Sequence, residues 1–173
     1  MAQGFVQRIV GAAKLDVATY EEVESDRSAT GQAAGVVLLV VIASGLGLLA
    51  AGGFATLLIA ALSALLGWIV WAAVIYVVGA KLLPESGTRA DVGELMRTLG
   101  FAQGPGLLRV FGFLPLVGGL VYLVATLWTI ATTVVAVRQA LDYRSTGRAV
   151  GVTIIGFLVN GLVWWVLRGL TGI

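Results

Sequence analysis

Charged residues are absent from one long stretch of the chain, residues 28–80. A single α-helix of that length would measure about 80 Å, whereas the hydrocarbon core of a bilayer is about 30 Å thick. The stretch therefore has to fold back, and the glycine pair in 50–53 (Ala-Ala-Gly-Gly) is the predicted hinge. It separates a first span at about 32–51 from a second at about 54–82. Later uncharged windows predict two more spans, at about 116–138 and 149–167.

The segment 90–114 is the least regular part of the apolar chain. Its first half carries Asp91, Glu94 and Arg97, and glycines and a proline weaken its middle. Hydrophobic residues recur at helical spacing opposite these charges, which predicts an amphipathic start capped by Thr88 and Asp91. Hydropathy alone does not decide whether this segment crosses the membrane.

Basic residues decide between four and five crossings, because short cytoplasmic loops carry the excess of Lys and Arg. If 90–114 crosses, nine basic residues lie inside and two, Arg109 and Arg168, lie outside. If it does not cross, the division falls to about six against five. We therefore expect an all-α polytopic transmembrane helical bundle of about five spans, the third of them short and broken by Gly and Pro. Its N-terminus is expected inside and its C-terminus outside.

Residues 1–30 are expected to form a short cytosolic or interfacial amphipathic segment, and 31–173 the transmembrane bundle. Arg8 belongs to the polar side of a possible first helix. The apolar side of that helix is formed by Phe5, Ile9, Val10 and Ala13. A capping box of Thr19 and Glu22 is predicted to start a second short helix. No cleavable signal peptide is visible ahead of the first apolar run.

The amino-acid composition excludes several classes of partner and of reactive group. Of 173 residues, 59% are hydrophobic and 12% are charged, which is typical of a membrane protein. The net charge of +2 indicates no nucleic-acid partner. The sequence contains no Cys and no His, so disulfides, thiol nucleophiles, imidazole bases and His-ligated cofactors are excluded.

No catalytic or metal-binding residue is predicted. Ser44 and Ser63 are isolated in apolar runs without a candidate base at a neighbouring helical position. The acids of the inner loop, such as Glu85 and Asp91, are expected to be solvated or to cap helices. We therefore expect no cofactor and no enzymatic activity.

The candidate contact residues are small or polar. Small residues at spacing four let helix backbones approach closely, either within the bundle or with another chain. A row of threonines on one face of the fourth span either packs against another helix or lines a water-filled permeation path. Asn160 either fastens the fifth span to the fourth or contacts a substrate. The full set is Gly47, Gly100, Gly104, Thr126, Thr129, Thr133 and Asn160.

Arginines are the candidate contacts with lipid. Arg138, Arg144 and Arg148 form a basic cluster that either holds anionic lipid headgroups or only sets the topology. Arg109 lies near the outer end of the third span, where its long side chain can reach the headgroups. An anchoring role is expected for Arg109 in preference to an anion site.

Several stretches carry a family resemblance. They are Thr30–Ala33 (TGQA), Leu99–Gly106 (LGFAQGPG), Leu114–Gly119 (LPLVGG), Ala136–Asp142 (AVRQALD) and Thr146–Ala149 (TGRA). With the Trp of the fourth span, they resemble the prokaryotic branch of the Yip1-domain family over nearly the whole chain. The resemblance implies a five-span protein with a cytosolic N-terminus and supplies no established activity for prokaryotic members. Eukaryotic members associate with membrane-anchored small GTPases in vesicle traffic.

These features predict a non-enzymatic integral membrane scaffold or adaptor, acting by itself or as an accessory subunit of a larger complex. Its expected partners are membrane lipid and other integral membrane proteins, or further copies of itself. The expected location is a prokaryotic cell (inner) membrane. The alternative is a small-solute transporter or channel, which the lack of ionisable residues inside the first, second, fourth and fifth spans disfavours.

Overall fold

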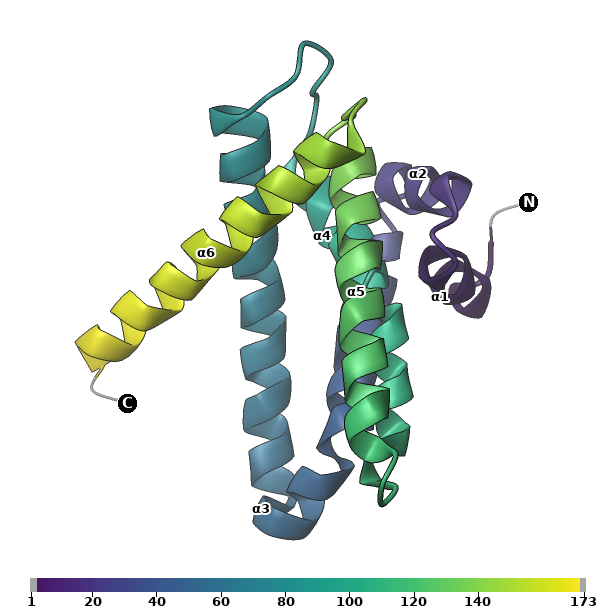
Figure 1. Ribbon diagram of the computed structural model, residues 1–173, viewed down its shortest axis with the longest axis vertical. Coiled ribbons are helices and arrows are strands. Elements are labelled where there is room, and N and C mark those ends of the chain that lie inside the picture. The colour runs from purple at the N-terminus through teal and green to yellow at the C-terminus, as the bar shows by residue number, and fades with distance from the viewer. Residues whose placement is uncertain (1–2, 172–173) are drawn as a thin grey trace.

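The computed structural model describes residues 3–171, and the side chains of these except residues 46–52, 167, 168, 170 and 171. The described chain consists of helices and connecting turns, without a strand. Two short helices, α1 and α2, lie against one end of a bundle of longer ones (Figure 1). The elements are α1 (Phe5–Ala13), α2 (Val17–Ser25), α3 (Ala29–Ile75), η1 (Tyr76–Leu82), α4 (Val92–Phe101), η2 (Gly104–Phe113), α5 (Gly118–Ala140) and α6 (Thr146–Thr171).

Helix α3 is a hairpin of two arms that meet at Gly53. This glycine has φ 67° and ψ −167°, a backbone conformation that residues with a Cβ rarely adopt. The two arms run in opposite directions on either side of it (Figure 1). The predicted hinge is therefore confirmed. The second arm continues into η1, a π-helix from Tyr76 to Leu82, where the Tyr143 hydroxyl donates to the carbonyl oxygens of Gly79 and Leu83, both at 2.8 Å.

The segment 90–114 is broken in the middle, as its glycines and proline predict. Helix α4 ends at Phe101, and η2 continues as a 3-10 helix from Gly104. The hydroxyl of Thr132 in α5 donates to the freed carbonyl oxygen of Ala102 at 2.7 Å. A buried carbonyl group that leaves the helical hydrogen-bond pattern needs such a partner. Asp91 is the N-cap, in a capping box with Glu94.

Three helices of the described residues are long and apolar enough to cross a membrane: Gly53–Leu82, Gly118–Ala140 and Thr146–Val166. They correspond to the predicted second, fourth and fifth spans within about three residues at each start. A fourth candidate is the pair of α2 and Ala29–Gly45, which are bent by 120°. The structure therefore supports a multi-pass membrane protein with three to four candidate spans.

Helix α6 begins beside the end of α5 and leans away from the other helices toward its C-terminus (Figure 1). It crosses the second arm of α3 at Gly156, where an added Cβ would lie 2.5 Å from Ile75 Cδ1. The rings of Trp71 and Phe157 stack at the same crossing, with centroids 4.6 Å apart. The crossing is thus made by a glycine and an aromatic pair.

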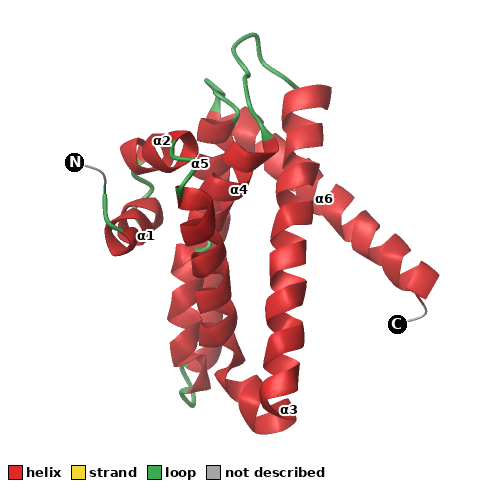
Figure 2. Ribbon diagram, turned by 180° about the vertical axis from the view of Figure 1, so that it is seen from behind, coloured by secondary structure: helices red, strands yellow, loops and turns green. Residues whose placement is uncertain are grey.

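The best-buried core lies at the end of the bundle that carries α1, α2 and α4 (Figure 2). Large side chains buried there include Tyr20, Ile75, Leu95, Leu99, Phe101 and Leu141. At the other end, many apolar side chains of α3 and α5 are exposed, among them Leu62 and Leu120. This distribution is typical of helices whose outer faces contact lipid.

The predicted capping box of Thr19 and Glu22 is wrong. Helix α2 begins three residues earlier than predicted, at Val17, because Asp16 caps it. The Asp16 carboxylate accepts hydrogen bonds from the backbone N–H of Thr19 at 3.3 Å and from its hydroxyl at 2.7 Å. An Asp at the N-cap satisfies the free N–H groups of the first turn as a Thr would. Glu22 is left free to bind elsewhere.

Candidate functional site

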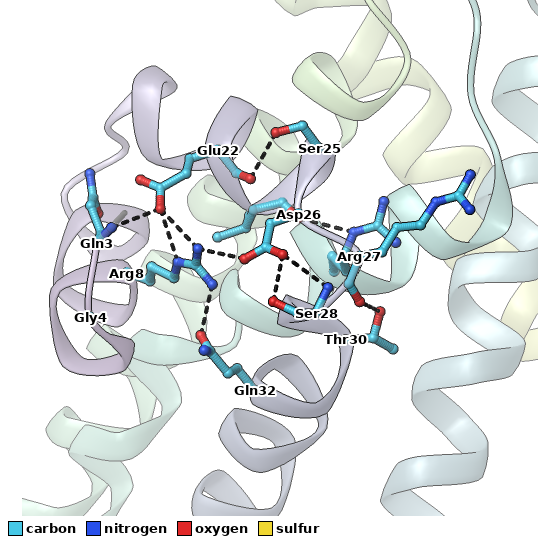
Figure 3. Close-up of polar contacts among 12 residues, drawn as sticks. Gln3, Gly4, Arg8, Glu22, Ser25, Asp26, Arg27, Ser28, Thr30 and Gln32 are labelled. Carbon is cyan, nitrogen blue, oxygen red and sulfur yellow. Dashed lines mark hydrogen bonds and ion pairs between the residues drawn. The ribbon is translucent and has the colours of Figure 1, made fainter. Parts of the chain in front are cut away.

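The N-terminal segment is held by a cluster of ionic contacts around Arg8 (Figure 3). Its guanidinium donates to Glu22 of α2 at 2.9 Å and to Asp26, which follows α2, at 2.7 Å. A third contact, at 3.0 Å, joins it to the side-chain oxygen of Gln32 in α3. Glu22 also accepts from the backbone N–H of Gln3 at 2.9 Å. One arginine therefore ties α1, α2 and the start of α3 together.

The electrostatics of this cluster favour the charged carboxylates. The hydrogen bond from Arg8 lowers the pKa of Glu22 below its usual value. Hydrogen bonds from Ser28 and then from Arg8 lower the pKa of Asp26 to about 2. Arg8 itself is only 2% exposed. The sequence pattern places Arg8 away from the apolar side of the first helix but does not indicate its burial, which arises because two acids beyond that helix provide it with a partner site.

Three side chains dock this segment onto the bundle, and one of them, Tyr20, also joins α2 to α1. The Tyr20 hydroxyl donates to the carbonyl oxygens of Ala12 at 3.1 Å and Thr132 at 3.3 Å. The indole N–H of Trp128 in α5 donates to the Ala13 carbonyl at 2.7 Å. Arg97 of α4 donates to the carbonyl oxygens of α2 near its C-terminal end. The segment is thus fixed against both α4 and α5.

Docking leaves an apolar face of the N-terminal segment uncovered. Val6 is 68% exposed and Val10 is 44% exposed, with Leu15 and Val17 also exposed beside them. A shallow hollow of about 510 Å³ lies between α1 and the start of α2, and Val6, Val10, Lys14 and Thr19 are among its lining residues. Helix α1 therefore presents apolar side chains while its polar Arg8 points inward.

A second feature is a cavity of about 580 Å³ between the long helices. Both arms of α3, η2, α5 and α6 contribute to it. Its apolar lining is Val37, Val40, Val41, Ala60, Ala64, Gly67, Trp68, Trp71, Ile130 and Phe157. Its polar lining is Ser44, Gln103, Arg109, Thr126, Thr129, Thr133 and Asn160. The volume is within the range of small-molecule sites.

The predicted row of threonines on α5 lies along this cavity. The hydroxyl of Thr129 donates to the Ala125 carbonyl at 2.8 Å, and that of Thr133 to the Thr129 carbonyl at 2.7 Å. Thr126 lies 3.4 Å from the guanidinium of Arg109. The threonines thus use their protons within their own helix and present oxygen lone pairs to the cavity.

Three buried polar atoms of the cavity lack a hydrogen-bond partner among the described residues. They are Ser44 Oγ, Arg109 Nε and Asn160 Oδ1. Buried polar groups in proteins are almost always paired, so each of these needs an explanation. All three belong to residues that line the same cavity, which brings together α3, η2 and α6. Sequence reasoning treated each of them separately and did not associate them.

The small-residue candidates face this chain's own helices. A Cβ at Gly100 would lie 2.7 Å from Ala33 Cβ in α3, and one at Gly104 would lie 3.2 Å from Ile9 Cγ2 in α1. Gly47 falls within 46–52 and lies outside the residues whose surroundings the structure describes. A role of these residues toward another chain stays a prediction.

Two of the clustered arginines have partners within the chain. Arg138 donates to the Tyr143 carbonyl at 3.2 Å, near the end of α5. Arg148 lies 3.5 Å from Glu85 and over the ring of Tyr143. Arg144 has an exposed side chain. Contact with lipid headgroups stays a prediction for all three.

Comparison with known proteins identifies the fold family. A family model described as the Yip1 domain matches residues 16–167. The chain belongs to the Yip1 family. The match begins at Asp16, the N-cap of α2, so the Yip1 domain here includes α2, most of the Arg8 cluster and all the helices that line the cavity. No curated protein and no solved structure matches the chain.

Proposed function

We propose that this Yip1-domain protein is a non-enzymatic adaptor that recruits other integral membrane proteins through its N-terminal segment. The supporting observation is the exposed apolar face of α1, with Val6 68% exposed, on a segment that the Arg8 cluster holds in place. An immobilised apolar surface loses little conformational entropy on binding, which favours affinity. Lys14 at the edge of this face adds a positive charge.

The proposal includes five crossings, with the N-terminus in the cytoplasm of a prokaryotic cell and the C-terminus outside. Support comes from the length of the broken third segment. Ten residues of α4 rise about 15 Å and ten of η2 about 20 Å, together enough for about 30 Å of hydrocarbon. The first arm of α3 packs beside this segment, at Gly100 and Gly106.

Photocrosslinking in native membranes tests the adaptor function. A photoreactive amino acid replaces Val6 on the exposed face, and mass spectrometry identifies the adducts. We expect one or a few integral membrane proteins, or a second copy of this chain, in amounts comparable to the protein itself. A matched probe at Glu21, which is exposed on α2 but polar, should give far fewer protein adducts.

Adducts with lipid alone at Val6 would contradict the adaptor function. They would indicate that the apolar face of α1 lies in the membrane surface without binding protein, as amphipathic interfacial helices do. Equal yields of protein adducts from Val6 and Glu21 would also contradict it, since the apolar face would then confer no preference.

A second candidate function is supported by the cavity. A small-solute transporter or channel needs a polar site at membrane depth, and Ser44, Arg109 and Asn160 form one between the helices. Flux of a labelled solute or single-channel conductance in liposomes tests this function. A purified protein that leaves liposomes as tight as empty ones would exclude it.

A further inference from the structure

The cavity between the long helices carries one positive charge and, among the described lining residues, no negative one. The charge belongs to Arg109. Its guanidinium makes one weak contact, 3.4 Å from Nη2 to Thr126 Oγ1, while Nε has no partner in the described chain. A charge in apolar surroundings is costly unless it is paired. The cavity therefore contains a cation that an anion would stabilise.

Two donors without acceptors belong to residues that line this cavity. Arg109 Nε–H and the Ser44 hydroxyl can both donate, and neither finds an acceptor among the described residues. An oxyanion such as a phosphate or a carboxylate accepts several such bonds at once. Asn160 Oδ1 is an acceptor without a donor in the described chain, and suits a hydroxyl group on the same ligand.

The cavity is elongated, and apart from the threonines of α5 and Gln103 its remaining lining is apolar. Its wall on the second arm of α3 runs from Ala60 to Trp71, about 16 Å along the helix axis. Ser44 lies nine residues before the hinge Gly53, whereas Trp68 and Trp71 lie 15 and 18 residues after it, so their rings are farther from the hinge than Ser44. Phe157 stacks on Trp71 and adds a third ring surface at this end of the cavity. A small inorganic anion would leave this apolar surface uncovered. A ligand with a hydrocarbon portion would cover it.

The cavity has access from the side of the bundle. Ile130 on α5 is 42% exposed and Phe157 on α6 is 47% exposed, although both line it. Helix α6 leans away from α5 beyond their junction, as both views show (Figures 1 and 2). These two partly exposed lining residues place the mouth of the cavity between α5 and α6, on the side from which a ligand can enter directly from the bilayer.

We propose that this cavity binds an acidic amphiphile from the membrane. The anionic headgroup contacts Arg109 and Ser44, and the hydrocarbon portion lies along Trp68, Trp71 and Phe157. This inference goes beyond the adaptor function. It uses the cavity of the second candidate function but requires no transport.

Native mass spectrometry of the full chain tests this inference. The protein is reconstituted in vesicles of equal parts phosphatidylglycerol and phosphatidylcholine, extracted in mild detergent, and scored for retained lipid. We expect one retained phosphatidylglycerol per chain. Arg109→Gln should lower its retention about tenfold or more, because charge-assisted hydrogen bonds are lost. Arg89→Gln removes the same charge from an exposed loop residue and should leave retention unchanged.

A steric variant makes the test independent of charge. Ala64→Leu places extra atoms in the cavity and keeps every ionic group, so retention should fall about as much as in Arg109→Gln. If Arg109→Gln does not yield monodisperse protein, Ser44→Ala serves instead, with a smaller loss of about threefold or more. Gel filtration establishes that each variant is folded before it is scored.

Three results would overturn the proposal. They are no retained lipid in the wild-type protein, equal retention of the two lipids, or retention that Ala64→Leu does not change. Separate arms with oleic acid and with inorganic phosphate distinguish the sources of the anion. Displacement of phosphatidylglycerol by oleic acid supports an amphiphile site, whereas displacement by inorganic phosphate alone overturns it. Crosslinks at Val6 do not bear on this result, because Val6 does not line the cavity.

Discussion

Gly100 of α4 lies directly against Ala33 of α3. A Cβ added to Gly100 would stand 2.7 Å from Ala33 Cβ and 3.2 Å from its Cα and carbonyl oxygen. Two helices that approach so closely meet backbone to backbone, as small residues allow in membranes. This contact sets the distance between α4 and the first arm of α3. The positions of the α4 side chains that contact neighbouring helices, such as Arg97, depend on this distance.

Gly100→Ala should therefore destabilise the protein. The added methyl group meets backbone atoms that cannot move aside, and overpacking of this kind costs about 1–3 kcal/mol. Gly151→Ala in α6 is the matched control, because nothing lies within 4 Å of its added Cβ. It should leave stability unchanged or raise it by up to about 1 kcal/mol. Thermal unfolding in detergent measures both, and equal midpoints would contradict the close contact.

Removal of Arg8 should loosen the N-terminal segment. Arg8→Met leaves the partly buried carboxylates of Glu22 and Asp26 without their cation, although Gln3 and Ser28 still donate hydrogen bonds to them. We expect a loss of stability well below that for fully buried pairs, because both acids are about 30% exposed and solvent screens their charges. Hydrogen exchange of residues 5–25 should accelerate in this variant.

Arg27→Met is the control for Arg8, since it removes an equal charge from an exposed neighbouring residue. Hydrogen exchange of residues 5–25 in Arg27→Met should be as slow as in the wild-type protein. If Arg8→Met also exchanges at the wild-type rate, the ionic cluster does not hold the segment, and the apolar contacts of Phe5 and Tyr20 do so alone.

Glu24 should make stability depend on pH. Burial, followed by repulsion from Glu94 and Asp142, raises the pKa of Glu24 to about 7, against the attraction of Arg97. The folded protein therefore holds a proton that the unfolded chain releases near pH 4.5. Protonated Glu24 makes its full contribution to the free energy of unfolding below about pH 4.5. This contribution is lost as the pH rises to about 7.

Glu24→Gln should remove this loss. At pH 8 the variant should be more stable than the wild-type protein by about 1 kcal/mol, after allowance for solvent screening. At pH 4.5 the two should unfold together. Unfolding midpoints between pH 4.5 and 8 provide the measurement, and parallel curves would contradict a raised pKa. Asp26, with its pKa lowered to about 2, titrates outside this window.

Reporter fusions test the number of crossings. With five spans, a reporter fused after Leu114 should be outside the cell and one fused after Asp142 inside. Alkaline phosphatase and a fluorescent protein, each active on one side only, give opposite readings at the two sites. Both reporters on the cytoplasmic side would mean that α4 and η2 enter the membrane and return.

Local chemistry was sufficient to predict the hinge and three of the spans. Gly53 is the one described glycine with positive φ, and glycine pairs in an apolar run are rare enough to mark a turn. The second, fourth and fifth spans follow from windows without charge, because each helix must be apolar over the full bilayer thickness. The break after Phe101 likewise follows from the glycines and the proline of η2.

The candidate sites depend on contacts that the sequence pattern does not contain. The burial of Arg8 could not be predicted because its partners lie on other segments of the chain, 14 and 18 residues away. The cavity unites Ser44, Arg109 and Asn160 from three separate elements. Helical spacing shows which residues of one helix share a face, but it does not show which helix that face meets.

The position of Arg8 has a mechanical consequence. Because its guanidinium joins α1 to α2 and to Gln32 at the start of α3, the N-terminal helices cannot tilt independently of the hairpin behind them. A force applied to α1 is transmitted to the long helices and is not absorbed by a flexible linker. A partner protein that binds α1 at Val6 would therefore orient the whole molecule in the bilayer.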